Sequence, residues 1–391
     1  MSRAKQPRML IRLLLLALVL AGCGDTIVGG DLASGDLAST SADLAVASDL
    51  AVAVDSATPV DLDSPCADPS DGGVWSELRC TGLYSDWATR TVDPANREFV
   101  PSYRLWSDGA QKRRWIYLPP GTKIDVTDLN AWTFPIGTKL WKEFSLDVGG
   151  TSTRIETRLL WKRDTSWVMT TYAWSADQST AVELPGGMVD VPGTNHYEIP
   201  SANSGGCTVC HNGRPDRVLG FEAISLAEAT PLSWTDLQTA TLVTSTNGNH
   251  TVAGSALLVP GNATEKPAIG YLHANCGNAC HHPGGTGPFS MRVDITSGAA
   301  PAAPANVQST AVFSAINTHS GFTPSGGTGN YYRIRPTDVS RSTIPFRMNT
   351  RGGYPQMPPV DTHVVDSAGL AAVSAWITAM TAAPYPAPAA P

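Results

Sequence analysis

The chain has 391 residues, of which 42% are hydrophobic and 16% charged, and its formal net charge at pH 7 is −7. Without the four basic residues of its leader, which contains no acidic residue, the net charge becomes −7 − 4 = −11. This acidic balance argues against nucleic acid or an anionic lipid surface as the partner. The low charge and the many glycines and prolines favour an exported, loop-rich protein.

Residues 1–22 are predicted to be a lipoprotein signal peptide. Basic residues precede the apolar run 13–20, which is too short to span a bilayer but suits an export signal. The run ends in Leu-Ala-Gly-Cys, with the cysteine at Cys23, and this ending resembles the lipobox of bacterial lipoproteins, in which the cysteine is acylated. We therefore expect a lipid anchor on Cys23 that holds the protein in the cell envelope, at the outer membrane. An uncleaved anchor or a plain signal peptide is the alternative.

Residues 23–65 are expected to form a disordered tether. Asp-Leu-Ala recurs four times among Ser, Ala and Thr, and Gly24 to Pro65 contains no Lys, Arg or aromatic residue, so this stretch has too little apolar mass for a core. Cys66 and Cys80 follow. Because export places them in an oxidising compartment and the other five cysteines have other roles, we expect them to form a disulfide.

Residues 66–200 are predicted to form a mainly antiparallel β domain. Gly- and Pro-containing turns separate short runs rich in Trp, Thr and Val, and polar and apolar residues alternate in 152–161 and 166–174. We expect an antiparallel sandwich or an open barrel. Nine of the eleven tryptophans lie between Trp75 and Trp174. Most are expected in the core, with a ligand-stacking platform as the alternative.

Residues 201–262 contain the first cofactor motif, Cys207-Thr-Val-Cys210-His211. In C-x-x-C-H the two thiols add to the vinyl groups of one haem, and the adjacent histidine then binds the iron. A Cys207–Cys210 disulfide would leave His211 unexplained, and a zinc site would need further ligands. The sixth ligand of this iron is not obvious from the sequence, and the position could also be open. The candidates are His250, His196, Met169 and Met188.

Residues 263–382 contain the second motif, Cys276-Gly-Asn-Ala-Cys280-His281, which is one residue longer than the first. The extra residue can form a longer loop over the porphyrin edge, or the site can be a disulfide. Apolar spacing predicts a short helix over 267–275 and an amphipathic helix over 367–380. The tail, residues 383–391, should be disordered.

This order of elements resembles a class I cytochrome c: a helix with a haem motif, a late Met-Pro-Pro loop at Met357, and a terminal helix. The resemblance implies that His281 is the proximal ligand and Met357 the distal one. A thioether ligand raises the reduction potential relative to a second histidine. Met348 is the second candidate for the distal ligand, and a gap-filling core role is the alternative for Met357.

Three further segments resemble a family of exported bacterial haem proteins, most of whose members are known only as conserved hypothetical proteins. They are the segments LWSDGAQKRRW at 105–115, WTFPIGT at 132–138 and ETRLL at 156–160. The likeness covers roughly residues 75–380. It implies a Trp-rich β region joined to C-x-x-C-H motifs and a C-terminal cytochrome c module, and it implies no substrate.

Together these features predict an α+β multidomain protein in which a mainly antiparallel β domain precedes a mainly α cytochrome c-like domain. The expected function is a lipid-anchored dihaem c-type cytochrome with two haem c groups and their iron, passing electrons to a redox partner protein in the envelope. An electron-transfer protein is favoured over an enzyme. The alternatives are a peroxidase- or oxidase-like enzyme with an open site at the first haem, and a ligand-binding β domain with the haems as its electron sink.

Overall fold

The computed structural model describes residues 66–69 and 72–381. The predicted signal peptide, the acylation site Cys23, the tether 23–65 and the tail 383–391 lie outside the described residues. No helix in the described part of the chain is both long and apolar enough to cross a membrane.

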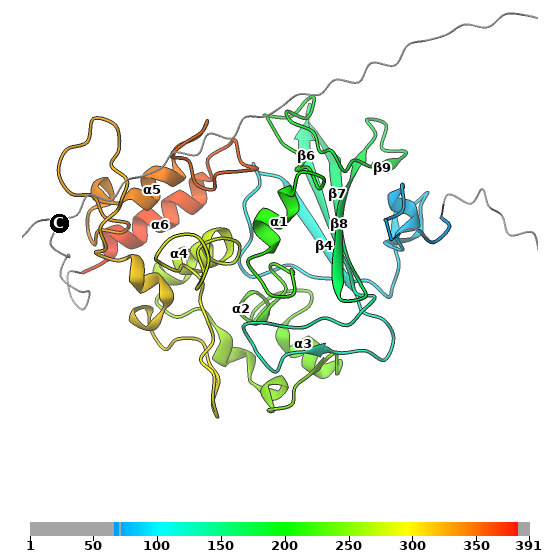
Figure 1. Cartoon of the computed structure of the whole chain (residues 1–391), viewed down its shortest axis with the longest axis horizontal. Helices are drawn as coiled ribbons and strands as arrows, with labels where there is room; N and C mark the ends of the chain where they lie inside the picture. The colour runs from blue at the N-terminus through cyan, green and yellow to red at the C-terminus, as the bar shows by residue number, and fades with distance from the viewer. Residues whose placement is uncertain (1–65, 70–71, 382–391) are drawn as a thin grey trace, which may run out of the picture. The chain divides into compact units, whose positions relative to one another are not determined.

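A six-stranded antiparallel sheet with the order β3-β4-β6-β7-β8-β9 forms the centre of the first half (Figure 1). The two alternating segments predicted as strands form β7 (Thr151–Arg163) and β8 (Ser166–Trp174). Together with β6, they are the longest strands of the sheet. Branched and aromatic residues at every second position favour this extended conformation. The other strands are β1 (Tyr84–Asp86), β2 (Thr91–Val92), β3 (Arg97–Glu98), β4 (Gln111–Tyr117), β5 (Ile124–Asp125), β6 (Lys139–Val148), β9 (Ala181–Glu183) and β10 (Val243–Thr244).

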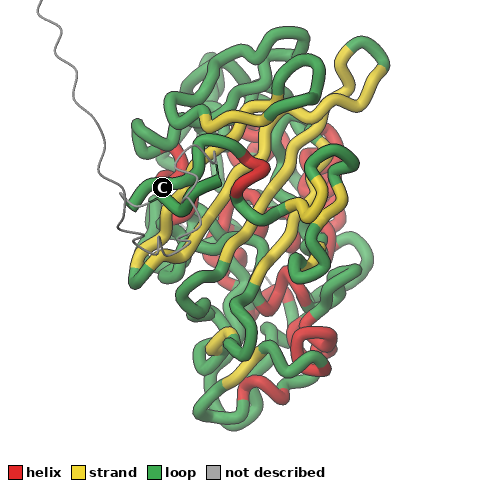
Figure 2. The backbone as a smooth tube through the Cα atoms, turned by 90° about the vertical axis from the view of Figure 1, so that its right-hand side faces the viewer, coloured by secondary structure: helices red, strands yellow, loops and turns green. Residues whose placement is uncertain are grey.

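The expected sandwich or barrel is not found, because no second sheet of comparable size faces this one within the described residues. An N-terminal segment covers one face instead, where Leu78 and Leu83 pack on Trp115, Trp141 and other apolar side chains. Figure 2 shows the strands in front of most of the helices, which cover the opposite face. All eleven tryptophans are buried or half-buried, so they act mainly as core residues.

The N-terminal segment contains the cysteine pair expected from the sequence. Cys66 and Cys80 form a disulfide with a Cα–Cα distance of 4.7 Å. The bond closes a loop with a sequence separation of 14 residues just before the segment that packs on the sheet. It therefore restricts the unfolded chain at the start of the folded region.

The predicted helices are present near their expected positions. The terminal helix α6 is Ser367–Ala379, and its buried Val373 and Ile377 belong to the face expected from the pattern. It crosses α4 where Gly369 lies so close to the ring of Tyr271 that a Cβ there would be 2.1 Å from it. The helices are α1 (Gly206–His211), α2 (Ala223–Leu226), α3 (Trp234–Thr239), α4 (Glu265–Leu272), α5 (Thr343–Met348) and α6.

One large hydrophobic core joins the sheet to the helices. It runs in sequence from Phe99 to Met380 and includes Leu140 from the sheet, Ile269 from α4 and Trp376 from α6. The fold is therefore α+β, and the segments 66–200, 201–262 and 263–382 pack as one unit around a shared core.

Candidate functional site

The first motif forms a short helix, although the sequence places it directly after a loop. Gly205 ends that loop with φ at 78°, a conformation that favours glycine, and α1 begins at the next residue. Residues three apart share a helix face, so Cys207 and Cys210 point to the same side. Both are half-buried free thiols. Burial raises the pKa of Cys210 to about 11, with a further contribution from nearby Cys280, so this sulfur is protonated at neutral pH.

His211 ends this helix with the orientation that a metal-binding imidazole usually has. Its Nδ1 lies 2.5 Å from the carbonyl oxygen of Arg217 and donates to it. This bond leaves Nε2, which makes no hydrogen bond within the described residues, available to an iron. Burial lowers the pKa of His211 to about 4. The ring is therefore neutral at pH 7, as metal ligation requires.

The second motif begins in a π-helix, and this geometry accommodates its extra residue. Helix α4 continues into a π-helix over His273–Gly277. The amide of Asn278 donates to the carbonyl of His273 at 2.9 Å, and the amide of His281 donates to that of Cys276 at 2.8 Å. Both bonds span five residues, so the widened turn takes in the additional residue without an excursion of the chain. Cys276 and Cys280 are free thiols in this turn.

His281 repeats the arrangement found at His211. Its Nδ1 donates to the carbonyl oxygen of Thr286 at 2.8 Å, and its ring stacks on Phe289 with the ring centroids 4.7 Å apart. The two contacts hold the plane of the imidazole and leave Nε2 without a hydrogen-bond partner in the described part of the chain. Burial lowers the pKa of His281, which favours the neutral ligand form.

A cavity of about 280 Å³ opens beside the second motif. Cys276, Cys280 and His281 line it, and so do three methionines, Met291, Met348 and Met357. Met291 and Met348 are 3% and 6% exposed and belong to the large core, whereas Met357 is half-buried in the loop that precedes α6. The site thus brings a histidine, two thiols and thioethers from distant parts of the sequence around one apolar space. Its other walls include Tyr271, Phe289, Phe322, Ile344, Arg333 and Arg347.

The two motifs pack directly against each other. A Cβ on Gly213, two residues after His211, would lie 2.1 Å from the carbonyl oxygen of Asn278 and 2.6 Å from that of Ala279. Asn278 and Ala279 are two of the three residues between the cysteines of the second motif. The absence of a side chain at position 213 therefore permits the close approach of the two sites.

We expect Gly213→Ala to disrupt this contact and lower the free energy of unfolding by about 1–3 kcal/mol, because the added methyl group would meet backbone atoms that cannot rotate away. Chemical denaturation measures the change. Gly186→Ala is the control, since a Cβ at Gly186 meets nothing within 4 Å. Equal stability of the two variants would contradict the packing described here.

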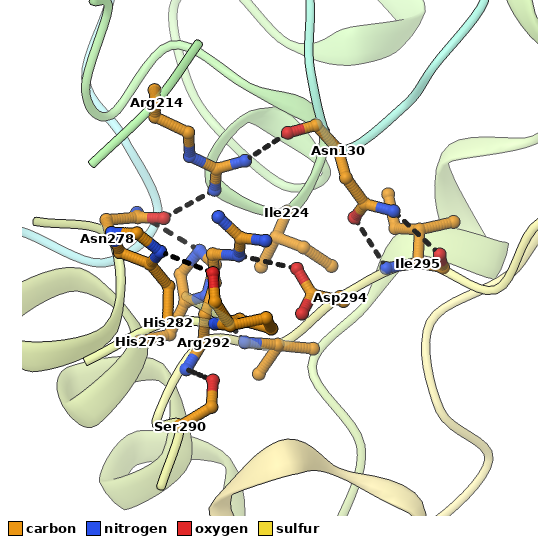
Figure 3. Close-up of polar contacts among 12 residues, drawn as sticks. Asn130, Arg214, Ile224, His273, Asn278, His282, Ser290, Arg292, Asp294 and Ile295 are labelled. Atoms are coloured by element: carbon orange, nitrogen blue, oxygen red, sulfur yellow. Dashed lines mark hydrogen bonds and ion pairs between the residues drawn. The ribbon is translucent and has the colours of Figure 1, made fainter. Parts of the chain in front are cut away.

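A buried polar network lies beside the contact between Gly213 and residues 278–279 and stabilises it (Figure 3). Arg214 donates to the side-chain oxygen of Asn278 and lies 3.8 Å from the carboxylate of Glu222. His273 Nε2 lies 3.3 Å from Glu222. His273 Nδ1 accepts from the backbone amide of Val293 at 2.9 Å, so the proton of a neutral ring must be on Nε2, where only Glu222 can accept it. The network ties the chain after the first motif to both ends of the second motif's π-helix.

Of the four residues suggested as a sixth ligand for the first site, two make other contacts and a third is exposed. His250 bonds the hydroxyl of Ser245 at 2.9 Å. His196 is paired with Asp190 at 3.1 Å and its side chain is 69% exposed, and Met188 is 38% exposed. Met169 on β8 pairs with Leu160 on β7, and this pair points to the sheet face on which the first motif lies.

No pattern in the sequence indicates that Arg214, Glu222 and His273 are site residues. Glu222 and His273 are 51 residues apart and belong to no motif, so only folding brings them together.

No group of three His, Cys, Asp or Glu side chains suited to a metal ion exists among residues 66–69 and 72–381. The further ligands that zinc would need at Cys207–His211 are therefore not found there.

The fold and the two sites define an α+β protein with two thiol–histidine motifs, the second of which lines a partly enclosed apolar cavity. Comparisons of the chain with protein-family models, with curated proteins and with solved structures found no match.

Proposed function

We propose that this chain is a dihaem c-type cytochrome that transfers electrons in the bacterial cell envelope, anchored by a lipid on Cys23. The main support is the cavity that Cys276, Cys280 and His281 share with Met357. It combines two thiols for covalent attachment, a neutral imidazole with a fixed ring and a thioether. These are the protein groups that a c-type haem with His and Met axial ligands requires.

At this second site each residue has a separate task. Cys276 and Cys280 would hold the porphyrin by thioether bonds, and His281 and Met357 would bind its iron. The bound haem would supply one-electron exchange at its iron. Phe289 and the carbonyl of Thr286 keep the imidazole plane fixed, and the apolar walls exclude water.

Two cations at the same cavity fit the anionic edge of a haem. Arg333 and Arg347 line the space, and their pKa values are lowered by burial. Arg333 also lies over the ring of Phe289, 4.6 Å from its centroid. A guanidinium that is partly removed from water gains from pairing with a carboxylate such as a propionate.

The first site would hold its haem through Cys207, Cys210 and His211. The contact of Gly213 with residues 278–279 then favours a relay, because it brings the two covalent attachment points close together. An electron could enter at one haem and leave at the other toward a partner protein in the envelope. No residue of either site needs to move a proton for this function.

The deciding experiment is a haem count on the full chain matured with a c-type haem assembly system. We expect two covalent haems per chain by the alkaline pyridine spectrum and the intact mass. Cys207→Ser/Cys210→Ser and Cys276→Ser/Cys280→Ser should each retain one haem, while the control Cys66→Ser/Cys80→Ser should retain two. A chain that matures without covalent haem would overturn the proposal. Binding of cyanide or carbon monoxide by one of two haems would instead support an enzyme with an open position at that haem.

A further inference from the structure

Three cations lie side by side on the sheet face that the helices cover. In the register of the sheet, Arg114 on β4 pairs with Lys142 on β6, and Lys142 pairs with Arg158 on β7. Directly paired residues point to the same face, so the three side chains form one row, which we call the cationic row. Like charges opposite each other across strands are destabilising, and the row therefore needs negative charge near it.

The described residues supply only part of that charge. Arg158 makes a two-point ion pair with Glu156, at 2.6 and 3.0 Å. Arg114 is 5% exposed, and its Nη1 is buried with no hydrogen-bond partner. Lys142 lies over the ring of Phe144, 4.9 Å from its centroid, and forms neither a hydrogen bond nor an ion pair with any residue that the structure describes. Burial and the neighbouring cations lower its pKa well below the usual range, and a bound anion would favour its charged form. Two of the three cations thus lack a counter-charge, which is costly for groups removed from water.

Other charged groups near the row do not correct the imbalance. Lys112, two residues before Arg114, adds a fourth cation on the same face, and burial lowers its pKa to about 7. Asp361 adds a carboxylate whose charge acts on Arg158. Arg104 acts on both Arg114 and Lys112, and the carboxylate of Asp108 acts on Lys112. With Glu156, this makes three carboxylates for five basic side chains.

The row lies under the first cofactor motif. The chain before α1 is tied to the sheet by Tyr197, whose hydroxyl donates to Glu156 at 2.7 Å. The chain after α1 is tied to the same strand by Asp216, which lies 2.7 Å from the amine of Lys162. Since residues 156, 158 and 162 of β7 share one face, α1 crosses that face at Arg158. In Figure 1, α1 lies between the sheet and α4.

We propose that the cationic row is a binding site for a carboxylate or a small oxyanion next to the first motif. The planar guanidinium groups of Arg114 and Arg158 can each donate two parallel hydrogen bonds to such a group, and the ammonium of Lys142 between them adds a point charge. Two sources share this chemistry. One is a propionate of a haem held by Cys207 and Cys210, a source that rests on the proposed function, and the other is a free inorganic oxyanion.

The test is the thermal unfolding midpoint of the full haem-matured chain, in inorganic phosphate and in chloride at the same ionic strength and pH. Lys142→Met removes the central charge at similar length, Lys142→Arg keeps the charge, and Lys123→Met is the control at an exposed lysine. If a free oxyanion binds, the midpoint of the parent chain is higher in phosphate, Lys142→Met loses this shift, and the other two variants keep it. If a propionate occupies the row, Lys142→Met lowers the midpoint in both salts, and Lys142→Arg does not.

The variant Cys207→Ser/Cys210→Ser, which would lack only the haem of the first motif, distinguishes the two sources further. If a propionate occupies the cationic row in the parent chain, the midpoint of this variant should become higher in phosphate than in chloride. If a free oxyanion binds there, the variant should keep the phosphate-dependent shift of the parent chain. The inference is overturned if Lys142→Met raises the unfolding midpoint or leaves it unchanged in both salts. Replacing a buried cation that binds no anion with an apolar group is expected to stabilise the protein or leave its stability unchanged. It is also overturned if Lys142→Arg is as destabilising as Lys142→Met, which would mean a packing role. Because the phosphate comparison needs no haem, a chain that incorporates none would contradict the proposed function without deciding this one.

Discussion

Replacing Glu222 with glutamine is expected to lower the free energy of unfolding by about 3–5 kcal/mol. Glu222 is 4% exposed and faces Arg214 and His273, so the neutral amide would leave the guanidinium of Arg214 buried without its counter-charge. The backbone amides of Ile224 and Ser225 donate to different oxygens of Glu222, so the single amide oxygen of glutamine can keep only one of these two cap bonds. The loss would therefore combine the missing charge with one missing cap bond. Urea denaturation of the haem-matured chain measures it.

Glu98→Gln is the matched control. Glu98 pairs with Arg113 at 2.8 Å, but both side chains are substantially exposed, at 34% and 53%. An exposed pair contributes about 1 kcal/mol at most. We also expect Arg214→Gln combined with Glu222→Gln to cost less than the sum of the single changes, since the double variant leaves no isolated charge. Additive costs would show that the two side chains do not interact.

The cost of Glu222→Gln should depend on pH with a defined sign. Burial alone would raise the pKa of Glu222, but its hydrogen bond with His273 and the charge of Arg214 lower it below its usual range. A carboxylate with a lowered pKa stabilises the fold above its unfolded pKa of about 4.3. This stabilisation is lost as the pH falls through the lower, folded-state pKa. The difference between the parent chain and Glu222→Gln should thus be constant above about pH 5.5 and shrink below about pH 4.

Met357→Ala is expected to open one coordination position on the haem proposed at the second motif and lower its reduction potential by on the order of 100 mV, within the roughly 0.8 V range that axial ligands span. The reason is that a thioether ligand raises the potential, and Met357 is the half-buried methionine of the loop at the cavity. Redox titration and binding of carbon monoxide to the reduced protein measure the two effects.

Met348→Ala separates a ligand from a core methionine. Met348 lines the same cavity but is 6% exposed and belongs to the large hydrophobic core. Its truncation should cost about 2–5 kcal/mol of stability. It should leave the potential and the carbon monoxide response nearly unchanged. If the spectral change follows Met348 and not Met357, Met348 is the ligand.

Local patterns in the sequence predicted much of the secondary structure. Alternation over 152–161 and 166–174 predicted β7 and β8, and the apolar spacing of residues 367–380 predicted α6, because these patterns reflect which side of one element is buried. The pairing of Cys66 with Cys80 followed from compartment and elimination, and it is present. The single open sheet was not predicted, since alternation shows that one face is buried but not what covers it.

The sequence by itself determined the chemistry of each motif: two thiols and a histidine at Cys207–His211, and the same set with one extra residue at Cys276–His281. Spacing of this kind is local, so it can be read from neighbouring residues. Only the tertiary structure decided how the extra residue fits, through the five-residue hydrogen bonds of a π-helix, and that Gly213 packs on residues 278–279. The Glu222–His273 contact and the cationic row depend on strand register and on contacts between distant segments, which no local pattern specifies.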